Sequence, residues 1–112
     1  MDWTLVFSGG LGNLDNGRPY GLITHGSSLY VVFSNVETGV ELWRSLDGSD
    51  WEQVVDAGWG DSKNMFADYL DKGAAVFNGA LYVGVNNWAN GAQIWRLLAE
   101  FHQIYLPLVT RN

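Results

Sequence analysis

The chain of 112 residues contains no cysteine, only two prolines and few basic side chains. The absence of cysteine excludes disulfides, thiolate chemistry and cysteine-based zinc sites. Six Lys and Arg against twelve Asp and Glu give a formal net charge of −6. This charge disfavours nucleic acid and anionic membrane surfaces as partners. No apolar run approaches the ~18 residues of a membrane span, so we expect no membrane insertion. No basic and then apolar signal segment opens this chain.

Glycine and aromatic residues are abundant by contrast, with fourteen Gly and six Trp. An apolar content of 47% against 16% charged residues predicts one globular domain rather than a disordered chain. Short runs rich in β-branched and aromatic residues alternate with Gly, Asn, Asp and Ser, which is typical of β-strands joined by tight turns. The predicted strands are Trp3–Ser8, Tyr20–His25, Leu29–Ser34, Val40–Ser45, Trp51–Asp56, Gly73–Phe77, Ala80–Val85 and Ala92–Leu97.

The same pattern occurs twice along the chain. Gly39–Arg44 matches Gly91–Arg96, and Leu29–Val31 matches Leu81–Val83, both at an offset of 52 residues. A period of this size, built from strand-like runs, is typical of a β-propeller blade.

A second block repeats at an offset of 48 residues. Its matching pairs are Asp2/Asp50, Trp3/Trp51, Val6/Val54, Gly10/Gly58, Gly12/Gly60 and Asn16/Asn64. Because the two offsets differ by four, about four extra residues are expected within Met65–Lys72, in a loop, where insertions are tolerated.

We therefore predict an all-β fold of two four-stranded antiparallel β-propeller blades, a partial propeller, over residues 1–100. The strand order would be circularly permuted, with Trp3–Ser8 as an N-terminal outer strand. Residues 101–112 would form a C-terminal tail or edge strand, because Pro107 cannot occupy a central strand. Two blades would leave apolar flanks exposed, which predicts further propeller blades or self-association.

The run Gly39–Trp51, followed by the Gly58–Asp61 turn, resembles bacterial kelch-like or Asp-box (BNR-type) β-propeller repeat proteins. Phe77–Gly84 is similar to the strand that opens their blades. The motifs are specific for a fold and guide activity poorly. In Asp-box turns the Asp and Ser satisfy turn backbone groups while the Trp packs under the hairpin. The resemblance implies this structural role for Ser45, Asp47, Gly48 and Trp51.

The repeated large side chains are interpreted as structural. Arg44 and Arg96 occupy the same position in the two repeats, as do Trp43 and Trp95. A repeated arginine suits a turn cap or an ion pair between blades. It does not suit the arginine cluster that a sialidase-like site would need. We therefore expect no catalytic residues and no enzyme.

Metal sites and cofactors are not predicted either. His25 and His102 are the only histidines and stand far apart in the sequence. The loops Asn13–Asn16 and Asp61–Asn64 carry oxygen ligands of the kind that Ca²⁺ takes, but they lack the spacing of a calcium loop. Turn formation is the favoured interpretation of both.

Two tryptophans in predicted loops are candidates for ligand contact. Trp88 lies in the turn Asn86–Asn90, and Trp59 lies between two glycines. Indole faces on loops can stack on sugar rings while amides bond hydroxyl groups, so the predicted ligand-binding residues are Trp88, Asn86, Asn87 and Trp59. The alternative is that each indole covers a loop or packs against the next blade.

These observations favour a non-catalytic β-propeller repeat module, part of an extracellular or cell-surface bacterial scaffold for binding or adhesion. Its partner would be a glycan or protein ligand. One alternative is an oligomeric carbohydrate-binding lectin assembled from two-blade subunits, in which Trp88 and its neighbours line the sugar pockets. A third is a remnant of a sialidase-like glycoside hydrolase.

Overall fold

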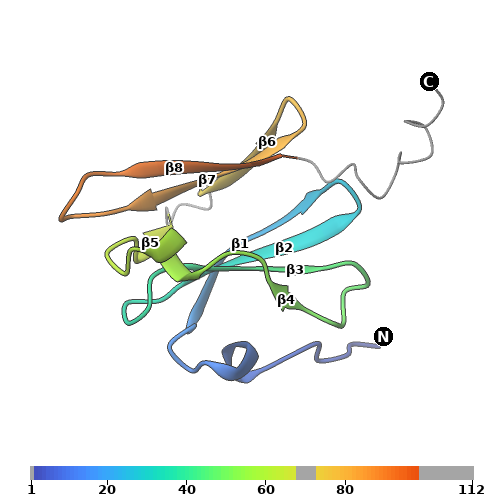
Figure 1. Cartoon of the computed structure of the whole chain (residues 1–112). Helices are drawn as coiled ribbons and strands as arrows, with labels where there is room; N and C mark the ends of the chain where they lie inside the picture. The colour runs from blue at the N-terminus through green and yellow to red at the C-terminus, as the bar shows by residue number, and fades with distance from the viewer. Residues whose placement is uncertain (1, 68–72, 99–112) are drawn as a thin grey trace.

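The computed structural model describes residues 2–67 and 73–98, and these form two antiparallel β-sheets (Figure 1). Sheet 1 is a meander in which each strand pairs with the next one along the chain. Its strands are β1 (Arg18–His25), β2 (Ser28–Ser34), β3 (Glu41–Ser45) and β4 (Glu52–Gln53).

Sheet 2 is organised around one central strand. Its elements are β5 (Phe66–Ala67), β6 (Ala74–Phe77), β7 (Ala80–Asn86) and β8 (Gln93–Leu98). All three others pair with β7: β8 lies along one edge, and β5 and β6 follow one another along the other edge. The β6–β7 turn is Asn78–Gly79, whose φ angles of 49° and 78° are those that a two-residue hairpin turn requires.

Two short turns of unusual backbone precede the sheets. They are η1 (Gly9–Gly12) before β1 and η2 (Ala57–Gly60) before β5. Leu11 in η1 and Trp59 in η2 both adopt a left-handed conformation, at φ 58° and 54°. L-residues adopt this conformation at a cost of about 1–2 kcal/mol, so surrounding contacts must hold both turns in place.

The two sheets correspond strand by strand. Val31 lies opposite Trp43 in sheet 1, and Val83 lies opposite Trp95 in sheet 2, so the register is preserved at the offset of 52 residues. The start of β1 corresponds to β5 at the offset of 48 residues, and the end of β1 corresponds to β6 at the offset of 52. Between Pro19 and Gly21 the β1–β2 register shifts, and residues 68–72, outside the described part, follow β5 at the matching place. Most of the extra residues expected within Met65–Lys72 therefore lie outside the described residues.

The hydrophobic core lies between the two sheets. Successive side chains of a strand point to opposite faces, so each sheet has an inner face toward the other sheet and an outer face. Sheet 1 contributes Tyr30, Val32, Val40 and Leu42, and sheet 2 contributes Leu81, Val83 and Val85. All seven are at most 3% exposed. Burial of this kind stabilises a fold by about 1.5–3 kcal/mol for each large apolar side chain.

The predicted all-β class is confirmed, and seven of the eight predicted strands overlap an observed strand. The prediction of an N-terminal outer strand over Trp3–Ser8 is wrong, because these residues form no strand. They match the region of β4, which pairs with β3 in sheet 1. Of the predicted strand Trp51–Asp56, only the two residues of β4 form a strand. The predicted tail, residues 101–112, lies outside the described residues.

Candidate functional site

The densest set of buried polar side chains in sheet 1 is a group of three, here named the first amide cluster: Asn16, Asn35 and Glu41. Asn35 Nδ2 donates to Asn16 Oδ1 over 2.8 Å, and Asn16 Nδ2 donates to Glu41 Oε1 over 2.8 Å. All three side chains are at most 5% exposed. The indole of Trp43 donates to the same carboxylate oxygen over 2.9 Å. The buried carboxyl group therefore receives several hydrogen bonds, which a buried polar group needs.

Sheet 2 contains the same arrangement, the second amide cluster: Asn64, Asn87 and Gln93. Asn87 Nδ2 donates to Asn64 Oδ1 over 2.8 Å, and Asn64 Nδ2 donates to Gln93 Oε1 over 3.0 Å. The indole of Trp95 donates to Gln93 Oε1 over 3.0 Å, as that of Trp43 does to Glu41. An amide thus accepts the same hydrogen bonds in sheet 2 as a carboxylate accepts in sheet 1.

Both clusters hold a turn between two strands. Asn35 Oδ1 accepts from the backbone N–H groups of Glu37 and Thr38, each over 2.9 Å, which closes the β2–β3 turn. Asn87 Oδ1 accepts likewise from Ala89 and Asn90, over 3.0 and 2.7 Å, in the β7–β8 turn. Asn87, a predicted ligand-binding residue, thus uses its side-chain amide inside the protein.

The sequence interpretation did not single out these clusters. The signal was present, since Asn16 and Asn64 match at the offset of 48, and Asn35 and Asn87 match at 52. Asparagines that occur at matching positions of both repeats, with no titratable residue matched beside them, indicate the same structural role in both. Which glutamate or glutamine completes each set depends on how the turns fold back onto β3 and β8.

The two acidic and amide loops form turns, as favoured over calcium binding. Asp61 Oδ1 accepts from the backbone N–H of Lys63 over 2.9 Å, and Asn13 Oδ1 accepts from Asp15 over 3.0 Å. Asp61 Oδ2 also accepts from Asn87 and Asn90. Hydrogen bonds from Lys63 N–H and then from these amides lower the pKa of Asp61 below its ordinary value.

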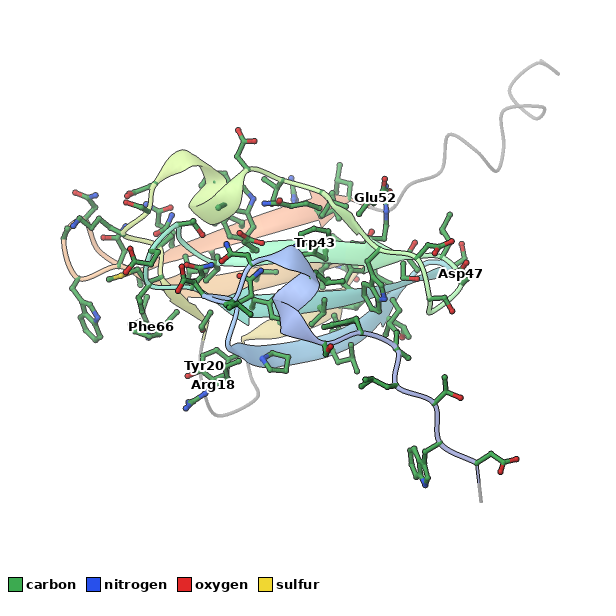
Figure 2. The ribbon with its side chains drawn as sticks, turned by 90° about the horizontal axis from the view of Figure 1, so that it is seen from below. Arg18, Tyr20, Trp43, Asp47, Glu52 and Phe66 are labelled. Carbon is green, nitrogen blue, oxygen red and sulfur yellow. The ribbon has the colours of Figure 1, made fainter. Side chains whose placement is uncertain are left out.

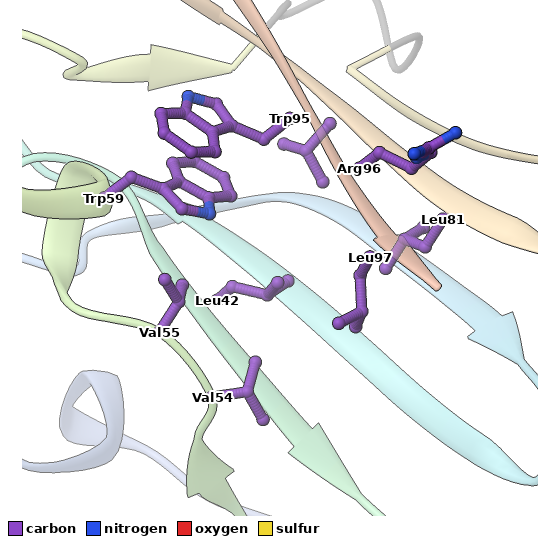
Figure 3. Close-up of a pocket in the computed structure, with 9 residues that line it drawn as sticks. Leu42, Val54, Val55, Trp59, Leu81, Trp95, Arg96 and Leu97 are labelled. Carbon is purple, nitrogen blue, oxygen red and sulfur yellow. The ribbon is translucent and has the colours of Figure 1, made fainter. Parts of the chain in front are cut away.

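The two predicted sugar-contacting tryptophans have different environments. Trp59 lies between the sheets, where its ring stacks on Trp95 with centroids 5.0 Å apart and planes 5° from parallel (Figure 3). Beneath this pair is a cavity of about 120 Å³, lined among others by Leu42 and Val55. Trp88 is 79% exposed in the β7–β8 turn, beside Asn86 at the end of β7. Of the two predicted sugar-contacting tryptophans, Trp88 is therefore the one whose indole is exposed.

The side chains of Ser45 and Asp47 hold the β3–β4 turn. The backbone N–H of Gly48 donates to Ser45 Oγ over 2.7 Å, and those of Ser49 and Asp50 donate to Asp47 Oδ1, each over 2.8 Å. The hydrogen bonds from Asp50 and Ser49 lower the pKa of Asp47. Next to this turn, the Trp51 ring contacts Phe7 edge-on at 5.6 Å.

The three arginines within the described residues do not converge on one site. Arg44 forms an ion pair with Glu52, its cross-strand partner within sheet 1. Arg18 donates to the hydroxyl of Tyr20 over 2.9 Å. Figure 2 shows Arg18 and Glu52 at opposite ends of the sheet, in agreement with the register. Arg96 is exposed on β8.

Over 2–67 and 73–98, no three His, Cys, Asp or Glu side chains gather in a way that could hold a metal ion. No helical segment within the same ranges has the length and apolarity to cross a membrane. No protein-family model, no curated protein and no solved structure significantly matches the chain.

Proposed function

We propose that the chain is a non-catalytic module of two β-propeller blades that serves as a binding or adhesion scaffold at a bacterial cell surface or outside the cell. The correspondence of the two sheets in register, turn conformation and buried polar clusters supports their being two copies of one blade. Scaffolds of this kind carry their ligand sites on the turns at the blade ends.

One observation carries the non-catalytic part of the proposal. The only buried carboxylate of the described residues, that of Glu41, accepts hydrogen bonds from three side-chain types, and Gln93 takes the same position in sheet 2. A general acid or base must exchange a proton, and a glutamine cannot. A position that accepts either residue serves to hold a turn.

The test is an activity screen with fluorogenic glycosides, including a sialoside, on the wild type and on Glu41→Gln. We expect the uncatalysed rate of hydrolysis for both proteins. Glu41→Gln should fold, because it places in sheet 1 the residue that sheet 2 already has. Turnover by the wild type that is lost in Glu41→Gln would contradict the proposal and favour the glycoside hydrolase remnant.

The lectin is a second candidate, and the exposure of Trp88 favours it. An indole that is 79% exposed on a turn, two positions along the chain from Asn86, has the form of a sugar-stacking platform. On a glycan array, a lectin of this kind would bind at least one carbohydrate class, and Trp88→Ala would weaken that binding by about tenfold or more. Trp3→Ala is the matched control, because Trp3 is 87% exposed and lies far along the chain from the turn. Equal signals from both variants and the wild type would remove the lectin.

A further inference from the structure

Corresponding residues of the two sheets differ sharply in burial. Leu42 on the inner face of sheet 1 is 3% exposed, whereas Ile94, its counterpart on the outer face of sheet 2, is 75% exposed. Val40 is buried and its counterpart Ala92 is exposed. Sheet 2 covers the two residues of sheet 1, Leu42 and Val40. No part of the chain within 2–67 and 73–98 covers their counterparts, Ile94 and Ala92. The outer face of sheet 2 therefore presents the same kind of surface that sheet 1 buries.

The contact between the sheets also uses a defined set of backbone hydrogen bonds. The β2–β3 turn of sheet 1 donates from Asn35 N–H to Met65 O over 3.1 Å and from Val40 N–H to Asn64 O over 2.7 Å. It accepts at Val40 O from Gly58 N–H over 2.7 Å. The segment that enters sheet 2, residues 58–65, is thus fastened to the turn of sheet 1.

The matching backbone groups at the two ends of the structure have no backbone partner among the described residues. In the β7–β8 turn these are the N–H of Asn87 and both the N–H and C=O of Ala92. In the segment that enters sheet 1 they are the N–H of Gly10 and the C=O groups of Asn16 and Gly17. The first set has two donors and one acceptor, and the second has one donor and two acceptors. The two sets are complementary to one another, and neither is complementary to itself.

The outer face of sheet 1 has the matching apolar surface. A groove of about 370 Å³ lies there, lined among others by Val6, Leu22, Leu29 and Val31. At the offsets of 48 and 52 residues, the counterparts of Val6, Leu29 and Val31 are Val54, Leu81 and Val83. All three counterparts line the cavity between the sheets together with Leu42. The groove on sheet 1 therefore corresponds to the cavity between the sheets, except that it has no residue in the place that Leu42 takes in that cavity. Ile94 is the residue at the leucine's position.

We propose that two copies of this chain associate head to tail, with the outer face of sheet 2 of one copy packed on the outer face of sheet 1 of the next. Ile94 enters the groove, and the β7–β8 turn bonds to residues 10–17 of the partner copy. The inference rests on the proposed equivalence of the two sheets as blades. A contact between two different surfaces is heterologous, so it continues from copy to copy and ends only when a ring closes.

The first experiment measures mass by light scattering across a wide range of protein concentration. We expect the wild type to have the mass of several chains. Ile94→Glu should weaken self-association by about tenfold or more, because it would bury an unpaired carboxylate. Leu46→Glu is the matched control, since Leu46 is 71% exposed in the β3–β4 turn and should leave the mass unchanged.

A variant of the complementary surface separates head-to-tail contact from a symmetric one. Leu22 is 67% exposed beside the groove, so Leu22→Glu should also dissociate the copies. Each variant retains the surface that the other has lost. Unlabelled Ile94→Glu added to ¹⁵N-labelled Leu22→Glu should therefore shift the amide signals of Asn87 and Ala92, while unlabelled Leu22→Glu should not. A symmetric contact would predict that only one of the two variants dissociates.

A wild type with the mass of one chain would overturn the proposal, as would equal effects of Ile94→Glu and Leu46→Glu. Absence of amide shifts in the mixed sample would overturn the head-to-tail arrangement. These outcomes are separate from those of the proposed function: a monomer that hydrolyses no glycoside contradicts the association alone, and an assembled hydrolase contradicts the scaffold alone.

Discussion

Gly39→Ala is expected to lower the free energy of unfolding by about 2–5 kcal/mol. Gly39 has a φ of 98°, which L-residues adopt only under strain. A Cβ there would lie 2.9 Å from Gly58 Cα, 3.0 Å from Gly58 N and 3.2 Å from Asp61 O. All three are backbone atoms of the segment that bonds to the β2–β3 turn, so they cannot move without breaking those bonds.

Gly91→Ala is the matched control for Gly39→Ala. Gly91 occupies the same position in the β7–β8 turn, with a φ of 93°, and a Cβ there would meet nothing within 4 Å. Its expected cost is the strain alone, about 1–2 kcal/mol. Urea denaturation of both variants should be done in the Ile94→Glu background, which keeps the β7–β8 turn uncovered. Equal losses would show that the close approach of Gly39 to Gly58 contributes nothing.

Asn64→Ala is expected to lower the free energy of unfolding by about 2–4 kcal/mol. The Asn64 side chain is fully buried and makes three hydrogen bonds: it donates to Gly58 O and Gln93 Oε1 over 2.9 and 3.0 Å, and accepts from Asn87 over 2.8 Å. Alanine would remove all three hydrogen bonds from the inside of the protein. A typical intramolecular hydrogen bond contributes about 0.5–1.5 kcal/mol to stability.

Asn90→Ala is the control for the amide effect. Asn90 is exposed and donates to Asp61 over 3.2 Å, so its removal should change the free energy of unfolding by less than about 0.5 kcal/mol. Thermal denaturation followed by circular dichroism measures both variants. Similar melting temperatures for Asn64→Ala and the wild type would mean that the amide cluster adds no stability.

Local pattern predicted the strands well where a neighbouring strand was available in the chain. Leu29–Ser34 and Ala80–Val85 were predicted almost to the residue, because continuous apolar runs bounded by turn residues specify central strands. Trp3–Ser8 has an equally strand-like sequence and forms no strand. A strand exists through hydrogen bonds to a partner, and no residue pattern within the segment can supply one.

The candidate site shows the same division. Sequence placed Trp59 and Trp88 alike, as tryptophans in loops, and the structure half-buries the first ring against Trp95 and exposes the second. The difference arises because η2 packs against β3 and brings Trp59 onto Trp95 of β8, while Trp88 lies in an exposed turn. Burial depends on which distant segment lies opposite, and one segment of sequence does not encode that.

By itself, the sequence determined the all-β class, the positions of the turns and the matched segments, since local alternation and turn residues act over a few neighbouring positions. The tertiary structure alone decided how these segments meet. It joined asparagines distant in the chain to Glu41 and Gln93, and it buried Leu42 while leaving Ile94 exposed. Both outcomes come from the packing of one sheet on the other, a contact between residues about fifty positions apart.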